Sequence, residues 1–347
     1  MLKEGTRRKA IERPLFSFLG NILLVMKQVP IIHTLLFVLL AFTASAQTDA
    51  PGSERALGVA DPTIYYYKGT YYLFGTNEGN AANGFTGYQS KDLQQWQPFI
   101  ALSKGSSFGT EGFWAPQVFQ YRKKFYMAYT ANENIAIAVS DKPTGPFKQD
   151  SLQQLTAPVK QIDPFVFIDD DGKVYLYHVR LERGNRIFVA EMKEDLSGIK
   201  DSTLKPCISG VVSGQDWENT TNSAWMVTEG PTVVKQNGKY YMFYSANDFR
   251  NPDYAVGYAV ADSPYGPWIK YAGNPIISRQ QLGIPGTGHG DLFTDKKGQL
   301  WYVLHTHNAA NKPTPRKTAM IKISFVPGIG PDRVQVDPGS FRYLQTN

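Results

Sequence analysis

The sequence predicts an all-β protein, a five-bladed β-propeller, and three observations support this fold class. One pattern of residues starts five times along the chain, at Asp61, Ala115, Asp163, Gly230 and Gly290. The segments AVSDKPTGPF and AVADSPYGPW occupy matching places in the second and fourth copies. Between the copies, no long amphipathic helix is evident. Repeated units of four short strands at a period of about 40 to 50 residues are typical of propeller blades.

Each copy begins with a small or acidic residue, usually followed by proline, and continues as a strand, a turn and an aromatic second strand. The five copies read DPTIYYYKGTYYLFGT, APQVFQYRKKFYMAYTA, DPFVFIDDDGKVYLYHV, GPTVVKQNGKYYMFYSA and GDLFTDKKGQLWYVLHT. Each copy is expected to supply about four strands, which in the fourth lie near 232–236, 239–247, 255–262 and 267–271. Because blades bury their faces against neighbours, one catalytic domain over 47–347 is predicted, with aromatic residues packed between blades. A β-sandwich or two separate β domains is the alternative.

Residues 1–46 are predicted to be an N-terminal extension that ends in a signal peptide. Lys27 precedes an apolar stretch over 31–42, and Ala44-Ser45-Ala46 fits the small-residue pattern of a signal peptidase site. Met26 stands directly before this signal and is a second candidate for the true start of the chain. An uncleaved anchor is the alternative, although the apolar stretch is short for a span of about 20 residues. We therefore expect a secreted or periplasmic protein without a stable membrane span.

The formal charge of +6 is concentrated outside the repeats. Residues 1–46 contain six Lys and Arg against two Glu, which leaves only +2 for the rest of the chain. The repeats show no basic stripe of the kind that binds nucleic acid, so a nucleic-acid partner is not expected. Cys207 is the single cysteine, which excludes an internal disulfide.

Carboxylic acids stand at three of the five copy starts. Asp61, Asp163 and Glu229 lead into the first, third and fourth copies, and Glu229 stands one residue earlier than the aspartates. Ala115 and His289 lead into the other two copies. Since the first strand of each propeller blade lines the central channel, the three carboxyls are expected to meet at one mouth.

Three such carboxylates would repel one another, so stability alone would not select them. For each aspartate, a turn-capping role before proline is the alternative. A carboxylic acid and a carboxylate about 6.5 to 9.5 Å apart are what inverting glycoside hydrolysis requires.

The motifs ADPTI, WAPQV, IDPFVF, TEGPTV and GHGDLF occur in this order, and with them the chain resembles glycoside hydrolase family 43 over essentially all of residues 57–337. This resemblance implies a five-bladed propeller enzyme that cleaves arabinose- and xylose-containing plant polysaccharides with inversion. It also implies that Asp61 is the general base, Asp163 the residue that adjusts the pKa of the acid, and Glu229 the general acid.

Four further residues are candidates for substrate binding. Phe113 and Trp114 precede the second copy and are expected to stack on a sugar face. For Trp114, packing between blades is the alternative. Trp225, four residues before Glu229, is expected to rim the cleft. The resemblance implies that Arg316 binds a sugar hydroxyl, and a solvated surface arginine is the alternative.

The resemblance further implies that His289 faces an axial water or a metal ion, commonly calcium. One histidine is a poor calcium site without oxygen ligands around it, so a structural calcium near the axis stays an open expectation. No cofactor is expected to be required for the chemistry. His305 and His307 lie two apart on a strand and are expected to be structural.

Taken together, these features predict a secreted inverting exo-glycoside hydrolase that acts on an arabinose- or xylose-containing oligosaccharide or polysaccharide. Many xylosidases of the family carry a further β-sandwich that is not seen after the repeats, so an α-L-arabinofuranosidase is expected first. A β-D-xylosidase or an arabinan-cleaving relative is the next alternative.

Alternatives from other classes remain. A non-catalytic carbohydrate-binding propeller would be favoured by loss of one of the three carboxyls. A fructoside-acting or phosphate-dependent family is disfavoured. Fructoside enzymes usually have Asn after the first Asp-Pro, where this chain has Thr63, and Arg before the later Asp-Pro, where it has Ile162. Phosphate-dependent enzymes would be expected to gather Arg and His at the pocket, and the sequence does not obviously supply such a cluster.

Overall fold

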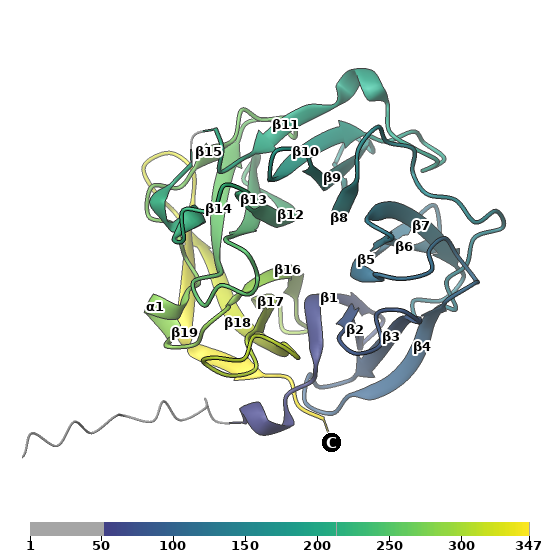
Figure 1. The fold of residues 1–347 in the computed structure, drawn as a ribbon, viewed down its shortest axis with the longest axis horizontal. Coiled ribbons are helices and arrows are strands. Elements are labelled where there is room, and N and C mark those ends of the chain that lie inside the picture. Colours follow the sequence, from purple (N-terminus) through teal and green to yellow (C-terminus); the bar gives the residue numbers. More distant parts are fainter. Residues whose placement is uncertain (1–51, 213, 347) are drawn as a thin grey trace, which may run out of the picture. The chain divides into compact units, whose positions relative to one another are not determined.

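The computed structural model describes residues 52–212 and 214–346, which form a five-bladed β-propeller (Figure 1). The predicted fold class is therefore confirmed. Residues 1–46, with the predicted signal peptide and Met26, lie outside the described residues. Within the described ranges, no helix is long and apolar enough to cross a membrane.

Five antiparallel sheets follow one another along the chain, and each is one blade. Blade one contains β1 (Val59–Tyr67), β2 (Thr70–Asn77), β3 (Gly84–Ser90) and β4 (Gln97–Ser103), and blade two contains β5 (Trp114–Tyr121), β6 (Lys124–Ala131) and β7 (Asn134–Ser140). Blade three contains β8 (Gln161–Ile168), β9 (Val174–Leu181), β10 (Asn185–Glu191) and β11 (Lys205–Ile208). Blade four contains β12 (Thr228–Gln236), β13 (Lys239–Ala246), β14 (Ala255–Ala261) and β15 (Ile269–Lys270). Blade five contains β16 (Gly288–Thr294), β17 (Leu300–Thr306), β18 (Lys317–Val326) and β19 (Arg333–Tyr343).

The described helices are short. They are α1 (Arg279–Leu282) and the 3-10 helices Ser53–Arg55, Asp201–Thr203 and Asp216–Asn219.

Blade two departs from the prediction of about four strands per copy, because its sheet has three. The segment that would form the fourth strand divides its backbone hydrogen bonds between two blades. Lys148 pairs with Val139 of β7, whereas the Phe147 N–H donates to the Ala101 carbonyl of blade one at 2.8 Å. This outer segment therefore joins the first two blades instead of extending one sheet.

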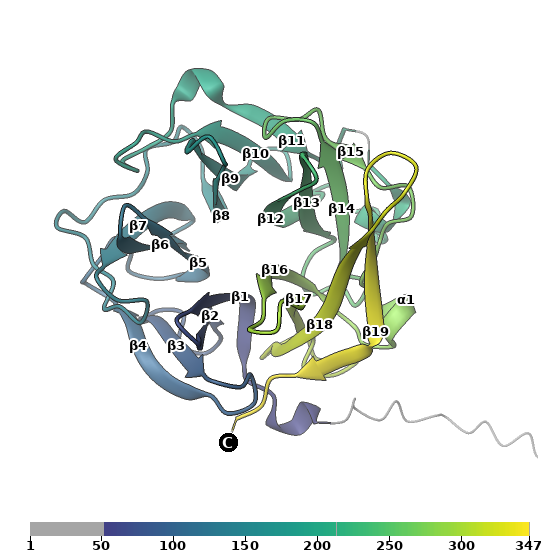
Figure 2. The ribbon, with the colours of Figure 1, turned by 180° about the vertical axis from the view of Figure 1, so that it is seen from behind.

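The innermost strands β1, β5, β8, β12 and β16 surround the centre of the propeller in both views (Figures 1 and 2). Each of these strands has a shift of register near its start. The residues at the shifts have positive φ, with values of 48° at Asp61, 42° at Ala115, 53° at Asp163, 58° at Gly230 and 35° at His289. A bulge of this kind re-aims side chains, and it does so here at every copy start.

At four of the five bulges, the N–H donates to a side chain of the preceding blade in the ring. The bonds run from Asp61 to His305 Nδ1 at 3.2 Å, from Ala115 to Thr76 Oγ1 at 3.0 Å, from Asp163 to Thr130 Oγ1 at 3.0 Å and from His289 to Ser245 Oγ at 2.8 Å. All four acceptors occupy the same register position on the second strand of their blades. The bulges are therefore fixed by a repeated contact between blades.

Aromatic residues of blade one fill the spaces on both of its sides. Tyr71 packs against Phe293 of blade five, with ring centroids 6.3 Å apart. On the other side, Tyr67 packs edge to face against Phe125 of blade two at 5.1 Å. The predicted packing of tyrosines between blades is confirmed.

The ring closes between its first and last blades without a shared strand. Leu57, just before β1, donates its N–H to the Leu344 carbonyl at 2.7 Å and accepts from the Thr318 N–H at 2.9 Å. The two ends of the described chain are thus hydrogen-bonded side by side, and this contact fixes blade one, which carries Asp61, against blade five.

Candidate active site

A pocket of about 430 Å³ lies where the inner strands begin. Asp61, Asp163 and His289 line it from three bulges, and Glu229 lines it from the residue just before the fourth. The other lining residues are Trp114, Ile162, Asn185, Trp225, Val227, Asp248, Phe249, Arg250 and Arg316. The structure therefore brings together the three predicted carboxyls, His289, Arg316 and both predicted pocket tryptophans.

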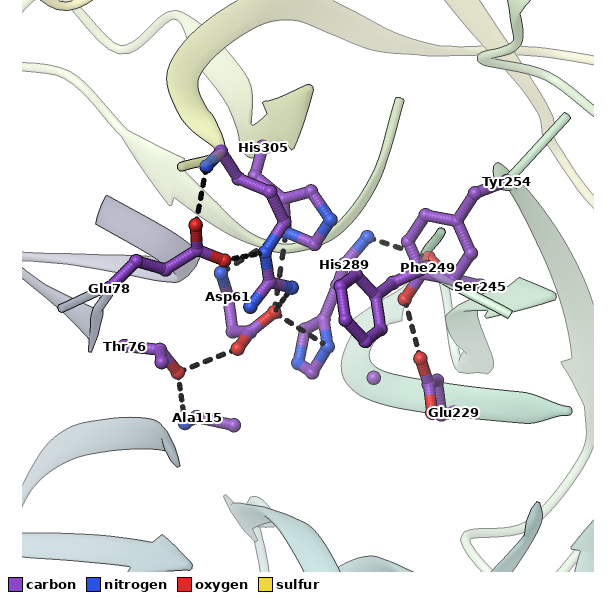
Figure 3. A network of polar contacts seen from close by, with 12 residues as sticks. Asp61, Thr76, Glu78, Ala115, Glu229, Ser245, Phe249, Tyr254, His289 and His305 are labelled. Carbon is purple, nitrogen blue, oxygen red and sulfur yellow. Dashed lines mark hydrogen bonds and ion pairs between the residues drawn. The ribbon is translucent and has the colours of Figure 1, made fainter. Parts of the chain in front are cut away.

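Asp61 is buried and held by residues of blades one and five (Figure 3). Its Oδ2 accepts from Thr76 Oγ1 at 2.6 Å, and its Oδ1 accepts from Arg316 Nη1 at 2.9 Å. His289 Nδ1 lies 3.3 Å from the same Oδ1. Burial alone would raise the pKa of Asp61, but Arg316 and His289 outweigh it and hold that pKa well below its usual value. Asp61 is therefore ionised at neutral pH.

Arg316 is itself fixed by an acid and an aromatic ring. Its Nε donates to Glu78 Oε1, and its backbone N–H donates to Glu78 Oε2 at 2.6 Å. Its guanidinium lies over the ring of Phe249, 4.5 Å from the centroid. The contacts made by Arg316 are thus with the candidate base and its surroundings, and binding of a sugar hydroxyl stays a prediction.

Glu229 is buried, and Figure 3 shows its carboxyl at one edge of the drawn network, beyond His289 and Phe249 as seen from Asp61. Its Oε1 accepts from the Tyr254 hydroxyl at 2.9 Å, and its Oε2 accepts from Asn185 Nδ2 at 2.8 Å. Burial raises the pKa of Glu229 to about 7, although these two hydrogen bonds act to lower it. Glu229 therefore holds a proton under conditions in which Asp61 has lost its own.

Asp163 has a raised pKa, like Glu229 and unlike Asp61. Its Oδ2 accepts from the Gly230 N–H at 3.2 Å and lies 3.8 Å from His289 Nδ1. Burial raises the pKa of Asp163 well above its usual value, and the charges of Glu229 and Asp61 raise it further. A carboxyl with a lowered pKa next to two with raised values is the separation expected of an acid and base pair in one site.

The two tryptophans line the pocket, whereas Phe113 does not. Trp114 and Trp225 line the pocket, and Trp225 is half exposed. Phe113 is fully buried and stacks on Tyr129, with ring centroids 6.0 Å apart. The prediction that Phe113 stacks on a sugar is wrong, because its ring faces the core between blades while the next residue faces the pocket.

The surroundings of His289 do not fit a calcium site. Calcium takes about six to eight oxygen ligands, whereas the nearest carboxyl oxygen, on Asp61, is already bound by Arg316. Across residues 52–212 and 214–346, no group of three or more His, Cys, Asp or Glu is arranged to hold a metal ion. A metal at His289 stays a prediction that these contacts do not support.

Sequence reasoning missed several residues that hold the carboxyls: Thr76, Glu78, Asn185, Phe249, Tyr254 and His305. His305 was expected to be structural, yet it accepts a hydrogen bond from the Asp61 N–H and its ring stacks on Tyr254 at 5.5 Å. Thr76 and His305 could have been found, because both occupy the shared position near the end of the second strand of their copies. The other four lie outside the repeated pattern.

A five-bladed propeller with an ionised carboxyl and a protonated one facing one pocket has the architecture of a glycoside hydrolase. The chain belongs to glycosyl hydrolases family 43, whose sequence pattern matches residues 56–328. The resemblance found in the sequence and the prediction of an enzyme are therefore confirmed.

The chain is similar to proteins with different stated activities. A crystal structure of an endo-1,4-β-xylanase from Bacteroides thetaiotaomicron is 41% identical, with a TM-score of 0.78, over 84% of this chain and 98% of that one. A β-xylosidase of Xylanibacter ruminicola is 27% identical over 71% of this chain and 86% of its own. A β-D-galactofuranosidase of Aspergillus niger is 25% identical over 78% of this chain and 79% of its own.

Proposed function

We propose that the protein is an inverting exo-glycoside hydrolase of plant polysaccharides that contain pentoses, with Asp61 as general base and Glu229 as general acid. The observation that carries this proposal is that two buried carboxyls of one pocket have opposite surroundings. Arg316 and His289 contact Asp61 and hold its pKa well below its usual value. Glu229 accepts instead from the neutral Tyr254 and Asn185 side chains, and burial raises its pKa to about 7. Inverting hydrolysis needs this division between an ionised and a protonated carboxyl.

In the proposed reaction, the Asp61 carboxylate removes a proton from a water molecule as the water oxygen attacks the anomeric carbon. Glu229 gives its proton to the glycosidic oxygen, and the bond between that oxygen and the anomeric carbon breaks. The water attacks from the face opposite the leaving group, so the product has the inverted configuration. Proton transfer between positioned groups suffices, and no cofactor is required.

After the reaction, each carboxyl returns to its starting state. Because Arg316 and His289 favour the charged form of Asp61, that residue releases its proton to solvent. Glu229 regains a proton because burial disfavours its charge. Asp163 is proposed as the residue that adjusts the pKa of the acid: when both carboxyls are ionised they repel each other, and this repulsion raises the pKa of Asp163.

For the sugar, we propose α-L-arabinofuranosides first and β-D-xylosides as the second candidate. The second candidate is supported by the 41% identity to a protein described as an endo-1,4-β-xylanase and by the similarity to a β-xylosidase. Trp114 and Trp225 would supply apolar faces to the substrate, and Arg316 a donor. We further propose export from the cytoplasm, on the signal-like segment that ends at Ala46, and a mature chain over 47–347.

Parallel assays with 4-nitrophenyl α-L-arabinofuranoside, β-D-xyloside and β-D-galactoside test this proposal, with NMR of the first anomer released. Hydrolysis of a pentoside with inversion is expected. A retained anomer would overturn the roles of Asp61 and Glu229. Absence of hydrolysis with these glycosides and with arabinoxylan and arabinan would overturn the enzymatic proposal itself. Monosaccharides released from a polysaccharide would indicate exo-action, and oligosaccharides would contradict it.

A further inference from the structure

Trp225 is an exposed aromatic residue with a fixed position at the pocket. Half of its surface is exposed, whereas Trp96 and Trp301 are almost fully buried in the core. Its ring lines the same pocket as Glu229. Its backbone is held by Ser223, whose Oγ accepts from the Trp225 N–H at 3.2 Å and donates to the Trp225 carbonyl at 3.0 Å. An exposed ring that is held in this way is prepared to receive a flat apolar face.

The loop that carries Trp225 is anchored by a buried ion pair. Glu218 lies 2.7 Å from Lys270 Nζ and also accepts from the Tyr244 hydroxyl at 2.7 Å. Two residues further along, Thr220 donates its N–H to Asn247 Oδ1 at 2.9 Å. These contacts attach the loop to blade four, the blade of Glu229.

Asn185 connects the indole of Trp225 to the candidate acid. Trp225 Nε1–H donates to Asn185 Oδ1 at 2.9 Å, and Asn185 Nδ2 donates to Glu229 Oε2 at 2.8 Å. An amide group has one acceptor end and one donor end. Because the indole takes the acceptor end, it directs the donor end of Asn185 toward Glu229.

The backbone of Asn185 is also fixed. Its N–H donates to the Met226 carbonyl at 2.9 Å, and its carbonyl accepts from Thr228 Oγ1 at 3.0 Å. The backbone N–H and carbonyl of Asn185, at the start of β10, are therefore both bonded to residues at or just before the start of β12. With its backbone fixed, Asn185 could still rotate its side chain, and the hydrogen bond from the Trp225 indole restricts that rotation.

Trp225 lies on the same side of the pocket as Glu229, and this position determines which part of the substrate it can contact. The general acid gives its proton to the glycosidic oxygen, so the leaving group lies beside Glu229. The contacts of Arg316, Glu78 and Phe249 are gathered instead around Asp61. A sugar ring that lies on Trp225 would thus be the first unit of the leaving group.

We propose that Trp225 and Asn185 form a leaving-group subsite that binds a sugar ring of the polysaccharide chain, in which Trp225 is the platform and Asn185 is a positioning residue for Glu229. This inference rests on the proposed function, because the assignment of Glu229 as the acid defines the leaving-group side. Its ligand class is a pyranose or furanose whose apolar face stacks on an indole. The subsite therefore favours oligosaccharides over glycosides with a small leaving group.

Kinetics of two variants on two substrates test the subsite. Trp225→Ala should lower kcat/KM for a xylo- or arabino-oligosaccharide by about tenfold, mainly through KM, because it removes the stacking surface. The loss on the 4-nitrophenyl glycoside should be about threefold or less. Equal losses on both substrates would overturn the platform. Thermal unfolding of each variant reports whether the fold is retained.

The positioning role has a separate readout in the pH profile. Trp225→Phe keeps a ring but frees the Asn185 amide, and Asn185→Ala removes the donor. Since this donor lowers the pKa of Glu229, both variants should move the alkaline limb of kcat to higher pH. Trp114→Phe, in the same pocket and without a bond to Asn185, is the matched control and should leave that limb in place. Identical profiles for the two Phe variants would overturn the role of Asn185.

Binding to an inactive variant separates this inference from the proposed function. Calorimetry compares the oligosaccharide with Glu229→Gln and with Glu229→Gln combined with Trp225→Ala. Weaker binding to the double variant, by about tenfold, is expected. Equal binding would overturn the subsite even if the wild-type protein hydrolyses glycosides, and the expected difference would support the subsite even if hydrolysis were not found.

Discussion

The backbone N–H of Gly230 donates a hydrogen bond to Asp163 Oδ2 across 3.2 Å, so the bulge of blade four orients a carboxyl of blade three. At the other four bulges, the N–H bonds to a Thr, Ser or His on the second strand of the preceding blade. The equivalent residue in blade three is Val179, which pairs with Ile162 and has no side-chain acceptor. The Gly230 N–H therefore donates to Asp163 instead, so the contact between blades that recurs at the other four bulges is replaced here by one with a candidate catalytic carboxyl.

Arg316→Gln should raise the pKa of the candidate base Asp61 and lower the stability of the fold. Arg316 is the leading influence that lowers the pKa of Asp61 against burial, so its loss should raise that pKa. Because the base acts when ionised, the acid limb of kcat/KM should move to higher pH, with a larger loss of activity at pH 5 than at pH 7. The buried Asp61 and the partly buried Glu78 would also lose their cation, which should lower the free energy of unfolding by about 3 to 5 kcal/mol.

Arg316→Lys is the control for this change, since it keeps a charge without the planar fork. It should move the acid limb less than Arg316→Gln does. pH profiles from pH 4 to 9, together with urea unfolding, check both statements. An acid limb that coincides in all three proteins would contradict the influence assigned to Arg316.

Glu229→Gln should alter the pH dependence of stability as well as abolish hydrolysis. The pKa of Glu229 is raised by burial from 4.5 to about 7, so the folded state binds this proton more tightly than the unfolded chain. The resulting stabilisation is fully present below about pH 4.5 and is lost as the pH rises through about 7. Between these limits, the wild-type free energy of unfolding should fall by about 3 kcal/mol more than that of the variant. Parallel urea titrations of the two proteins would contradict the raised pKa.

Asp163→Asn should lower the pKa of the acid without loss of the fold. The Asn carbonyl can still accept from Gly230, whereas the repulsion between Asp163 and Glu229 disappears. The alkaline limb of kcat should then move to lower pH, by an amount set by the fraction of Asp163 that is ionised when Glu229 titrates. Measured profiles for wild type and variant decide this, and a limb that moves to higher pH would rule out the role proposed for Asp163.

Alignment of the repeats was sufficient to predict the fold and the three carboxyls, because a propeller brings equivalent positions of successive blades to one axis. It could not show that Asp61 and Asp163 lie at bulges while Glu229 precedes one, since the bulge depends on backbone pairing. Phe113 and Trp114 illustrate the same limit. Both are aromatic and adjacent, and only the strand geometry decides which of them faces the pocket.

Several residues that set the pKa values were harder to predict because, unlike His289 and His305, they have no counterparts in the repeat. Glu78 and Arg316 are 238 residues apart and meet only when the ring closes. Tyr254 and Asn185 lie in or beside loops that differ from copy to copy. Contacts of this kind follow from the closed ring and not from any local pattern.

Gly230→Ala should destabilise the site beyond the ordinary cost of its backbone conformation. Gly230 has φ of 58°, and a Cβ there would lie 2.9 Å from ring atoms of His289. Gly238→Ala is the matched control, because Gly238 has φ of 74° with nothing within 4 Å of the added Cβ. The control should lose about 1 kcal/mol, and Gly230→Ala should lose more and also reduce kcat. Equal losses of stability and unchanged activity would contradict the close contact with His289.

Val179→Thr should restore the repeated contact in blade three at the expense of Asp163. Val179 is fully buried at the position that Thr76 and Thr130 occupy in their blades. Its new hydroxyl would compete with Asp163 for the Gly230 N–H. This bond lowers the pKa of Asp163, so the pKa should rise further in the variant while the carboxyl loses its orientation. We expect kcat to fall by about 10- to 100-fold, as for a small misplacement in an active site.

Burial of the new Thr hydroxyl should lower the free energy of unfolding by only about 1 kcal/mol if the hydroxyl finds a hydrogen-bond partner. A control variant, Val189→Thr, measures the cost of a buried hydroxyl that does not compete for the Gly230 N–H. Val189 is fully buried in β10 of the same blade, away from the bulges of the innermost strands. Val189→Thr should therefore lose stability but keep its kcat, because its strand partners are Tyr177 and Lys205, neither of which lines the pocket. If Val179→Thr retained the wild-type kcat, or if both variants lost activity to the same degree, the Gly230 N–H would not be what orients Asp163.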